Sequence, residues 1–145
     1  MKLDDVRSLL DAPSPAALLT YRPDGTADVS PVWFRCTEVA FEVTVAADDP
    51  KAAYLAADDR AVLTVFETVP PFRGVKVSGR VALDRDPEAV RAARQAIAPR
   101  YLGETRGAAF VESRGPGVVI RLPVTAARAW EMRAVLPRSG SSSAP

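Results

Sequence analysis

Short apolar runs, several of them alternating with polar residues, recur along the chain and predict a mainly β structure. In residues 39–45, valine and phenylalanine alternate with alanine, glutamate and threonine, which is the pattern of a strand with one buried face. Residues 74–83 alternate in the same way, whereas residues 61–66 are almost wholly apolar and predict a central strand. Further strands are expected at residues 16–21, 26–35, 118–122 and 126–132.

Turn residues and helix caps separate these strands. The sequence Pro-Asp-Gly at residues 23–25 predicts a hairpin turn, because proline presets φ and glycine accepts a positive φ. Asp49 followed by Pro50 predicts the first turn of a short helix. Gly103 is expected to stop the longest helix, and residues 104–116 show no clear pattern. Helices are expected at residues 3–12, 50–58 and 86–101.

The order of these elements predicts an antiparallel β-barrel with short helices. Strands and helices do not alternate as they do in a doubly wound fold, and the sequence has no glycine-rich nucleotide-binding loop. A chain of 145 residues has the size of one domain with one core. We therefore expect a single domain over residues 1–138 and a disordered polar tail over residues 139–145.

Charge and hydropathy argue against nucleic-acid and membrane partners. The chain has 19 Lys and Arg against 18 Asp and Glu, a balance that gives no electrostatic reason to bind nucleic acid. No apolar stretch approaches the roughly 20 residues that span a bilayer, and the charged start does not resemble a secretory signal. The single cysteine, Cys36, cannot form an internal disulfide, so a cytoplasmic location is expected.

The sequence contains no histidine. Histidine is the commonest general base near neutral pH and the commonest metal ligand, so its absence excludes Ser-His-Asp and Cys-His catalysis and histidine-ligated metals. We expect no metal site and no catalytic side chain. Any chemistry would then be carried by a bound cofactor.

Three segments, in this order and spacing, resemble the pyridoxamine 5′-phosphate oxidase-like flavin-binding split barrels. The resemblance covers nearly the whole chain, and it implies an antiparallel split β-barrel that forms a homodimer. It also implies a cofactor, FMN or the deazaflavin coenzyme factor 420, in a groove at the subunit interface. The segments are residues 18–34 (LLTYRPDGT, then VSPVWF), residues 50–60 (Pro-Lys with Leu55, Asp58 and Arg60) and residues 66–80 (Phe-Glu, PPFRGV, then Gly-Arg).

Lys51 is the strongest candidate for binding the cofactor. It stands in the first turn of the expected short helix, where unpaired N–H groups and the helix dipole attract anions. The resemblance implies that a lysine here reaches the cofactor phosphate. Asp48 and Asp49 bring negative charge to the same helix start, and the alternative interpretation is a solvated lysine on a surface helix.

Ser30, Pro31, Val32 and Trp33 occupy the strand that, by the resemblance, runs along the flavin ring. A serine hydroxyl could bond the polar edge of the ring, and an indole could form an apolar wall. The alternative is an ordinary strand with Pro31 at an edge or bulge and Trp33 in the core.

Two further residues are candidates for binding an anion. The resemblance places a hydroxyl residue such as Thr44 against the phosphate, although Thr44 could equally be a half-exposed strand residue. Arg73 follows the stiff Pro-Pro-Phe loop and could hold a phosphate or a substrate carboxylate bidentately. The alternative for Arg73 is a solvated cationic face.

Two departures from the family pattern limit the expected function. Residues 45–49 contain no arginine beside the expected phosphate, and the substrate-binding residues of true pyridoxamine phosphate oxidases have no match. The first hypothesis is an oxidoreductase that transfers a hydride between FMN, or alternatively a deazaflavin, and a small planar substrate. The alternatives are a ligand-binding split barrel without turnover and a barrel that acts through its dimer surface without any cofactor.

Overall fold

The structure is a computed structural model that describes residues 1–138. The expected disordered tail, residues 139–145, lies outside the described residues, so that expectation is not tested. Among the described residues, no helix combines the length and the apolar character that crossing a membrane requires.

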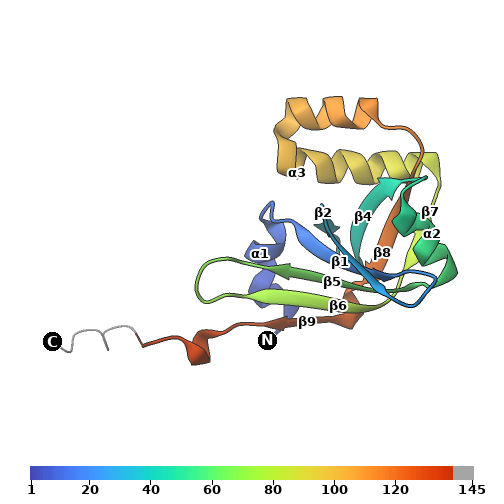
Figure 1. The fold of residues 1–145 in the computed structure, drawn as a ribbon. Helices are drawn as coiled ribbons and strands as arrows, with labels where there is room; N and C mark the ends of the chain where they lie inside the picture. The colour runs from blue at the N-terminus through green and yellow to red at the C-terminus, as the bar shows by residue number, and fades with distance from the viewer. Residues whose placement is uncertain (139–145) are drawn as a thin grey trace.

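Two antiparallel sheets form the body of the molecule (Figure 1), which confirms the expected mainly β fold with short helices. One sheet has the strand order β2-β1-β5-β6-β9 and the other has the order β3-β4-β8-β7. The strands are β1 (Ala16–Tyr21), β2 (Ala27–Val32), β3 (Arg35–Cys36), β4 (Ala40–Ala46), β5 (Arg60–Phe66), β6 (Gly74–Arg80), β7 (Ala82–Asp84), β8 (Gly117–Pro123) and β9 (Ala127–Trp130). The helices are η1 (Leu3–Val6), α1 (Arg7–Asp11), α2 (Pro50–Ala57), α3 (Pro87–Ser113), η2 (Val124–Ala126) and η3 (Arg133–Val135).

The hydrophobic core lies between the two sheets and includes side chains from both. Leu18 of β1 and Val77 of β6 are fully buried, and Ile120 of β8 is nearly so. Complete burial of such a side chain stabilises the fold by about 1.5–3 kcal/mol. The alternation in residues 74–83 therefore identifies the inward-facing Val75 and Val77 correctly, whereas in residues 39–45 Val39 is exposed and Glu42, on the expected outer face, is buried.

Two segments expected as single strands are each divided between the sheets. The expected strand over residues 74–83 is β6 in the first sheet and β7 in the second, where Leu83 pairs with Ile120. At the corner, the Val81 amide donates to the Asp59 carbonyl. The strand expected at residues 26–35 likewise ends as β2, and β3 begins at Arg35 in the other sheet. Alternation continues through the corner between β6 and β7, where Val75, Val77 and Val81 are all buried.

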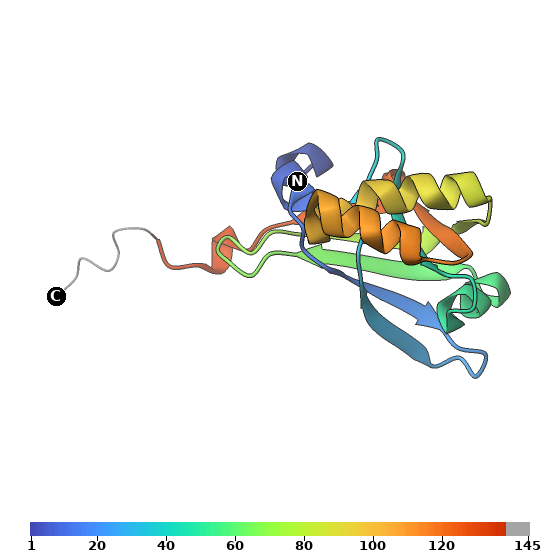
Figure 2. The same cartoon turned by 90° about the horizontal axis from the view of Figure 1, so that it is seen from above.

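The expected helix over residues 86–101 does break at Gly103, but the second helical arm that follows it was not predicted. Gly103 has φ 78° and ψ 172°, a conformation essentially restricted to glycine, and the chain turns there into a second helical arm that ends at Ser113. Figure 2 shows the two arms of α3 lying side by side. The second arm buries only Gly107 and Val111, which explains why its sequence shows no clear apolar stripe.

A buried carboxylate joins three strands of the second sheet. Glu42 is only 6% exposed, and it accepts hydrogen bonds from Arg35 Nε at 2.5 Å and Arg121 Nε at 2.7 Å. Arg121 also donates to Asp84 on β7 at 2.8 Å. Burial acts to raise the pKa of Glu42, but the hydrogen bonds from Arg121 and Arg35 outweigh it, so the pKa lies below its ordinary value.

We predict that Glu42 makes folding stability depend on acid pH. A lowered carboxyl pKa in the folded state adds stability above the unfolded pKa of about 4.3, and that stability is lost as the pH falls through the folded pKa. Glu42→Gln should therefore lower the free energy of unfolding by about 1.5–3 kcal/mol at pH 7 and flatten its decline in acid. Urea unfolding from pH 7 to 3 measures both effects. The exposed control Glu38→Gln should leave the profile unchanged, and equal profiles for the two variants would contradict the prediction.

We also predict that Gly107→Ala destabilises the α3 hairpin. A Cβ at Gly107 would lie 2.9 Å from the backbone N and Cα of Pro99 on the other arm, so the arms would have to separate. Such overpacking costs about 1–3 kcal/mol, which thermal unfolding would detect. Gly115→Ala is the matched control, because its Cβ would meet no atom within 4 Å. Equal melting temperatures for both variants would argue against close packing of the arms.

Candidate functional site

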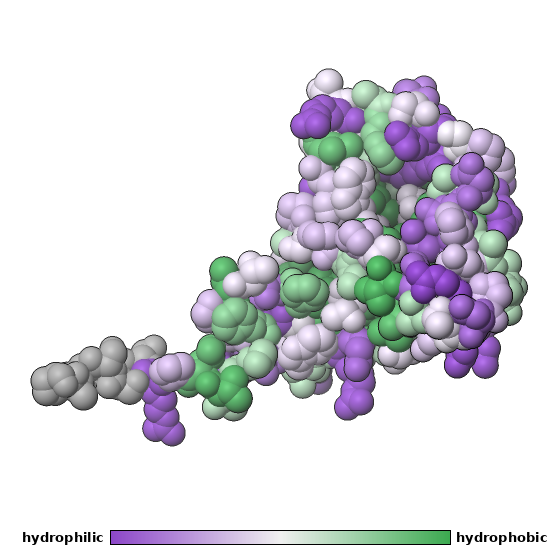
Figure 3. Space-filling model, in the orientation of Figure 1, coloured by the Kyte–Doolittle hydropathy of each residue, from purple (hydrophilic) through white to green (hydrophobic). Residues whose placement is uncertain are grey.

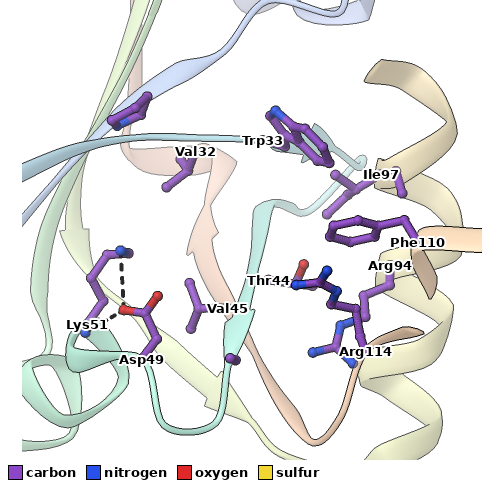
Figure 4. Close-up of a pocket in the computed structure, with 13 residues that line it drawn as sticks. Val32, Trp33, Thr44, Val45, Asp49, Lys51, Arg94, Ile97, Phe110 and Arg114 are labelled. Atoms are coloured by element: carbon purple, nitrogen blue, oxygen red, sulfur yellow. Dashed lines mark hydrogen bonds and ion pairs between the residues drawn. The ribbon is translucent and has the colours of Figure 1, made fainter. Parts of the chain in front are cut away.

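A cavity of about 380 Å³ lies between β2, β4, the start of α2 and the α3 hairpin (Figure 4). In the space-filling view the surface is hollowed below α3, with hydrophobic residues visible in the hollow (Figure 3). The cavity has apolar and aromatic walls with cationic side chains at two ends. Its lining consists of Pro31, Val32, Trp33, Thr44, Val45, Ala46, Asp49, Lys51, Arg94, Ile97, Ala98, Phe110 and Arg114.

Aromatic rings from the segment directly after β2 and from α3 form one wall of the cavity. The Trp33 indole stacks on the Tyr101 ring, with 5.0 Å between centroids and 8° between planes. Trp33 also contacts the Phe110 ring, which is tilted against it, with 5.5 Å between the ring centroids. Tyr101 is held by its hydroxyl, which donates to the Ser14 carbonyl at 2.9 Å and accepts from the Phe34 amide at 3.2 Å. The wall is therefore held in a defined orientation and offers a flat apolar surface to a ligand.

At one end of the cavity, Lys51 is paired with an acid. Asp49 caps α2 by accepting the Lys51 backbone N–H at 2.9 Å, as the sequence predicted. The same carboxylate oxygen lies 3.2 Å from Lys51 Nζ, and the lysine side chain is 17% exposed. The Lys51 ammonium is thus largely neutralised by Asp49.

At the other end lie two arginines that sequence reasoning missed. Arg94 is 7% exposed, and its Nη1 donates to the Gly115 carbonyl at 2.6 Å. The Arg114 guanidinium carbon lies 4.4 Å from the centroid of the Phe110 ring. Within residues 1–138, neither guanidinium has a carboxylate at ion-pair distance. At the other end of the cavity, by contrast, Lys51 is paired with Asp49. Figure 4 shows both arginines across the cavity from Lys51.

A sequence signal for Arg94 was present. It follows Val90 by four residues and precedes Ile97 by three, so it lies on the buried stripe of the helix. An arginine on an otherwise apolar stripe points to a special environment, since charged side chains are rarely buried without a partner. Arg114 lies beyond the stretch without a pattern and gave no comparable signal.

Five of the seven residues predicted to bind a cofactor line the cavity, and two do not. Ser30 pairs with Leu18 on the inward face of its strand, where its Oγ is buried without a hydrogen-bond partner. Arg73 binds the carboxylate of Glu67 with Nε and Nη2, both at 2.9 Å, and donates to Ser8 Oγ at 2.8 Å. In the chain described here, Arg73 ties the β5–β6 loop to α1. The five that line the cavity are Pro31, Val32, Trp33, Thr44 and Lys51.

The cavity can hold a flat molecule with an acidic group. Val32, Trp33 and Ile97 offer apolar contacts to a planar ring system. The Thr44 hydroxyl and the cations at the two ends offer hydrogen-bond donors to oxyanions. Asp49 is the single acidic residue in the described lining, and it is engaged by Lys51. The arrangement favours binding and orientation over acid–base chemistry.

Several solved structures share this fold. The conserved hypothetical protein Rv2991 from Mycobacterium tuberculosis has a TM-score of 0.81 at 22% identity, covering 98% of this chain and 94% of that chain. An F420 reductase has a TM-score of 0.66 at 27% identity, covering 84% and 94%. A FAD-binding protein from Mesorhizobium loti has a TM-score of 0.66 at 16% identity, covering 90% and 93%.

The sequence itself gives a family match. Comparison with curated proteins gave no match. The family profile described as pyridoxamine 5′-phosphate oxidase, however, matches residues 3–131, which span most of the described chain and include every strand. This protein therefore belongs to the pyridoxamine 5′-phosphate oxidase family of split β-barrels.

Proposed function

We propose that this protein is an oxidoreductase that binds a flavin-type cofactor and passes a hydride between it and a small planar substrate. The observation that carries the proposal is the cavity of about 380 Å³, which brings Lys51, Thr44 and the Pro31–Trp33 segment together beside a flat aromatic wall. FMN is the cofactor we favour, and a deazaflavin is the alternative. The similarity to an F420 reductase and to a FAD-binding protein supports this class of ligand.

The residues present fit such a cofactor. Val32, Trp33 and Val45 would contact the ring system, and Thr44 with Lys51 would hold the phosphate near the N-terminus of α2. Asp49 would have to share Lys51 with the phosphate, because the two side chains are paired at 3.2 Å. We therefore expect only moderate affinity for the phosphate at this end.

The chain would contribute binding and geometry to the reaction. When bound, a flavin or deazaflavin supplies a ring that accepts or donates a hydride. The wall of Trp33 and Phe110 would orient the substrate against that ring and exclude water. None of the described lining residues is a histidine or cysteine, and the single acid in that lining, Asp49, is paired with Lys51, so the chain contributes binding and orientation.

A second candidate is a ligand-binding protein without turnover. The pairing of Asp49 with Lys51 favours it, because the single acid in the described lining is already engaged. Under this alternative the cofactor would bind with the same affinity, but no nicotinamide- or substrate-dependent change in its absorbance would follow.

We further propose that the protein is a cytoplasmic homodimer with the cavity at the subunit interface. β2 is an edge strand, and its Val29 side chain is 62% exposed, as expected for a strand that another subunit covers. Light scattering after size exclusion at micromolar concentration should give twice the chain mass of 15.5 kDa. Val29→Glu should shift the population toward monomer. A wild-type monomer would contradict the dimer.

We predict that Lys51→Ala weakens FMN binding about tenfold, because a charge-assisted bond to phosphate contributes roughly 1.5 kcal/mol. Fluorescence titration with FMN and, separately, with the deazaflavin coenzyme measures the dissociation constants. Riboflavin, which lacks the phosphate, should bind wild type and Lys51→Ala equally.

Lys76→Ala is the control for this titration, because Lys76 is exposed on β6 and carries the same charge. Lys76→Ala should leave the affinities for FMN, the deazaflavin coenzyme and riboflavin unchanged. Binding of neither coenzyme by the wild-type protein would remove the redox function and leave the barrel that acts through its dimer surface.

A further inference from the structure

Arg94, at the far end of the cavity, is unlike the other buried charges of the molecule. Glu42 is buried but is bonded to two arginines, and Lys51 is paired with Asp49. Arg94, by contrast, has one hydrogen bond to a carbonyl and no carboxylate partner among the described residues. Burying a cation without a counter-charge costs stability, so a residue of this kind points to a function.

Local structure holds the Arg94 guanidinium in place. Gly117 opens β8 directly beside it, and a Cβ there would overlap the guanidinium and lie 2.9 Å from the Val45 carbonyl oxygen. The hydrogen bond to Gly115 fixes Nη1. Arg94 lines the cavity, and among the described residues its Nε and Nη2 make no hydrogen bond.

Arg114 brings a second positive charge to the same place. Both arginines line the cavity. Both side chains lie at this end of the cavity (Figure 4), and burial together with the charge of Arg114 lowers the pKa of Arg94, the direction that repulsion between two cations gives. An anion between them would relieve that repulsion and accept hydrogen bonds from two planar guanidinium groups.

The surroundings indicate what the anion is attached to. Arg114 lies over the Phe110 ring, and Phe110 contacts the Trp33 indole. An aromatic ring resting on this wall would bring an attached acidic group to the arginines. We propose that Arg94 and Arg114 form an oxyanion subsite that binds the carboxylate or phosphate of a flat aromatic ligand.

This subsite lies across the cavity from Lys51 and does not depend on the proposed cofactor. Its test therefore uses simple probes and the whole 145-residue chain without added cofactor. Calorimetric titration with naphthoate should give a dissociation constant at least about tenfold lower than titration with naphthamide, its neutral counterpart. Arg114→Gln should remove that difference, because it should weaken the binding of naphthoate and leave the binding of naphthamide unchanged.

Two further variants separate charge from folding. Arg94→Gln should weaken the binding of naphthoate, as Arg114→Gln does. Arg94→Lys should keep only part of the wild-type affinity for naphthoate, because lysine cannot bind bidentately. Arg114 is exposed in the single chain, so Arg114→Gln keeps the proposal testable if Arg94 variants fail to fold. Arg106 is an exposed arginine on the same hairpin and lies outside the cavity lining. Arg106→Gln therefore removes one charge away from the subsite and should leave the affinity for naphthoate unchanged.

FMN and riboflavin identify the source of the acidic group. If Arg114→Gln weakens FMN but not riboflavin, the subsite binds the phosphate of the cofactor. If FMN binding is unaffected and naphthoate binds the FMN-loaded protein, the subsite binds an acidic substrate.

Equal binding of naphthoate and naphthamide, no detectable naphthoate binding at millimolar concentration, or equal losses of naphthoate affinity in Arg114→Gln and Arg106→Gln would overturn the proposal. Failure of FMN binding alone would overturn only the proposed cofactor.

Discussion

The cavity depends on the attachment of α3 to the corner between β2 and β3. Arg100 donates hydrogen bonds to the carbonyls of Phe34, Leu10 and Ala12, and so joins α3, the strand corner and the N-terminal helix. Tyr101, the next residue, bonds the backbone of Phe34 and Ser14 and stacks on Trp33. These contacts place the hairpin over β4 and β8, and without them the aromatic wall would have no partner for Trp33.

The electrostatic design of the barrel differs from that of the cavity. On the second sheet, Glu42 is bonded to Arg35 and Arg121, so charge is balanced where three strands meet. In the cavity, one cation is balanced by Asp49 and two are not. The buried carboxylate of the barrel is thus paired with cations, whereas Arg94 and Arg114 have no carboxylate partner among the described residues and lie beside the aromatic surface where a ligand would bind.

The sequence predicted local structure well and the corners poorly. The Asp49 cap, the hairpin turn at Gly25 and the inward face of β6 follow from neighbouring residues, and the structure agrees with them. The corner between β6 and β7 was missed because the apolar alternation continues through it, and the corner after β2 because Val32, Trp33 and Phe34 form one apolar run. The second arm of α3 was missed because it packs mainly on the first arm through Gly107, and so needs few apolar residues.

By itself, the sequence determined the antiparallel β architecture, the absence of histidine chemistry and five of the residues that line the cavity. Those properties depend on local pattern and composition, and on a family resemblance carried by short motifs. Only the tertiary structure decided that Arg94 and Arg114 meet at one end of the cavity, and that Arg73 is bound to Glu67 away from it. Both outcomes depend on which side chains are brought together from distant segments, and no local spacing encodes that.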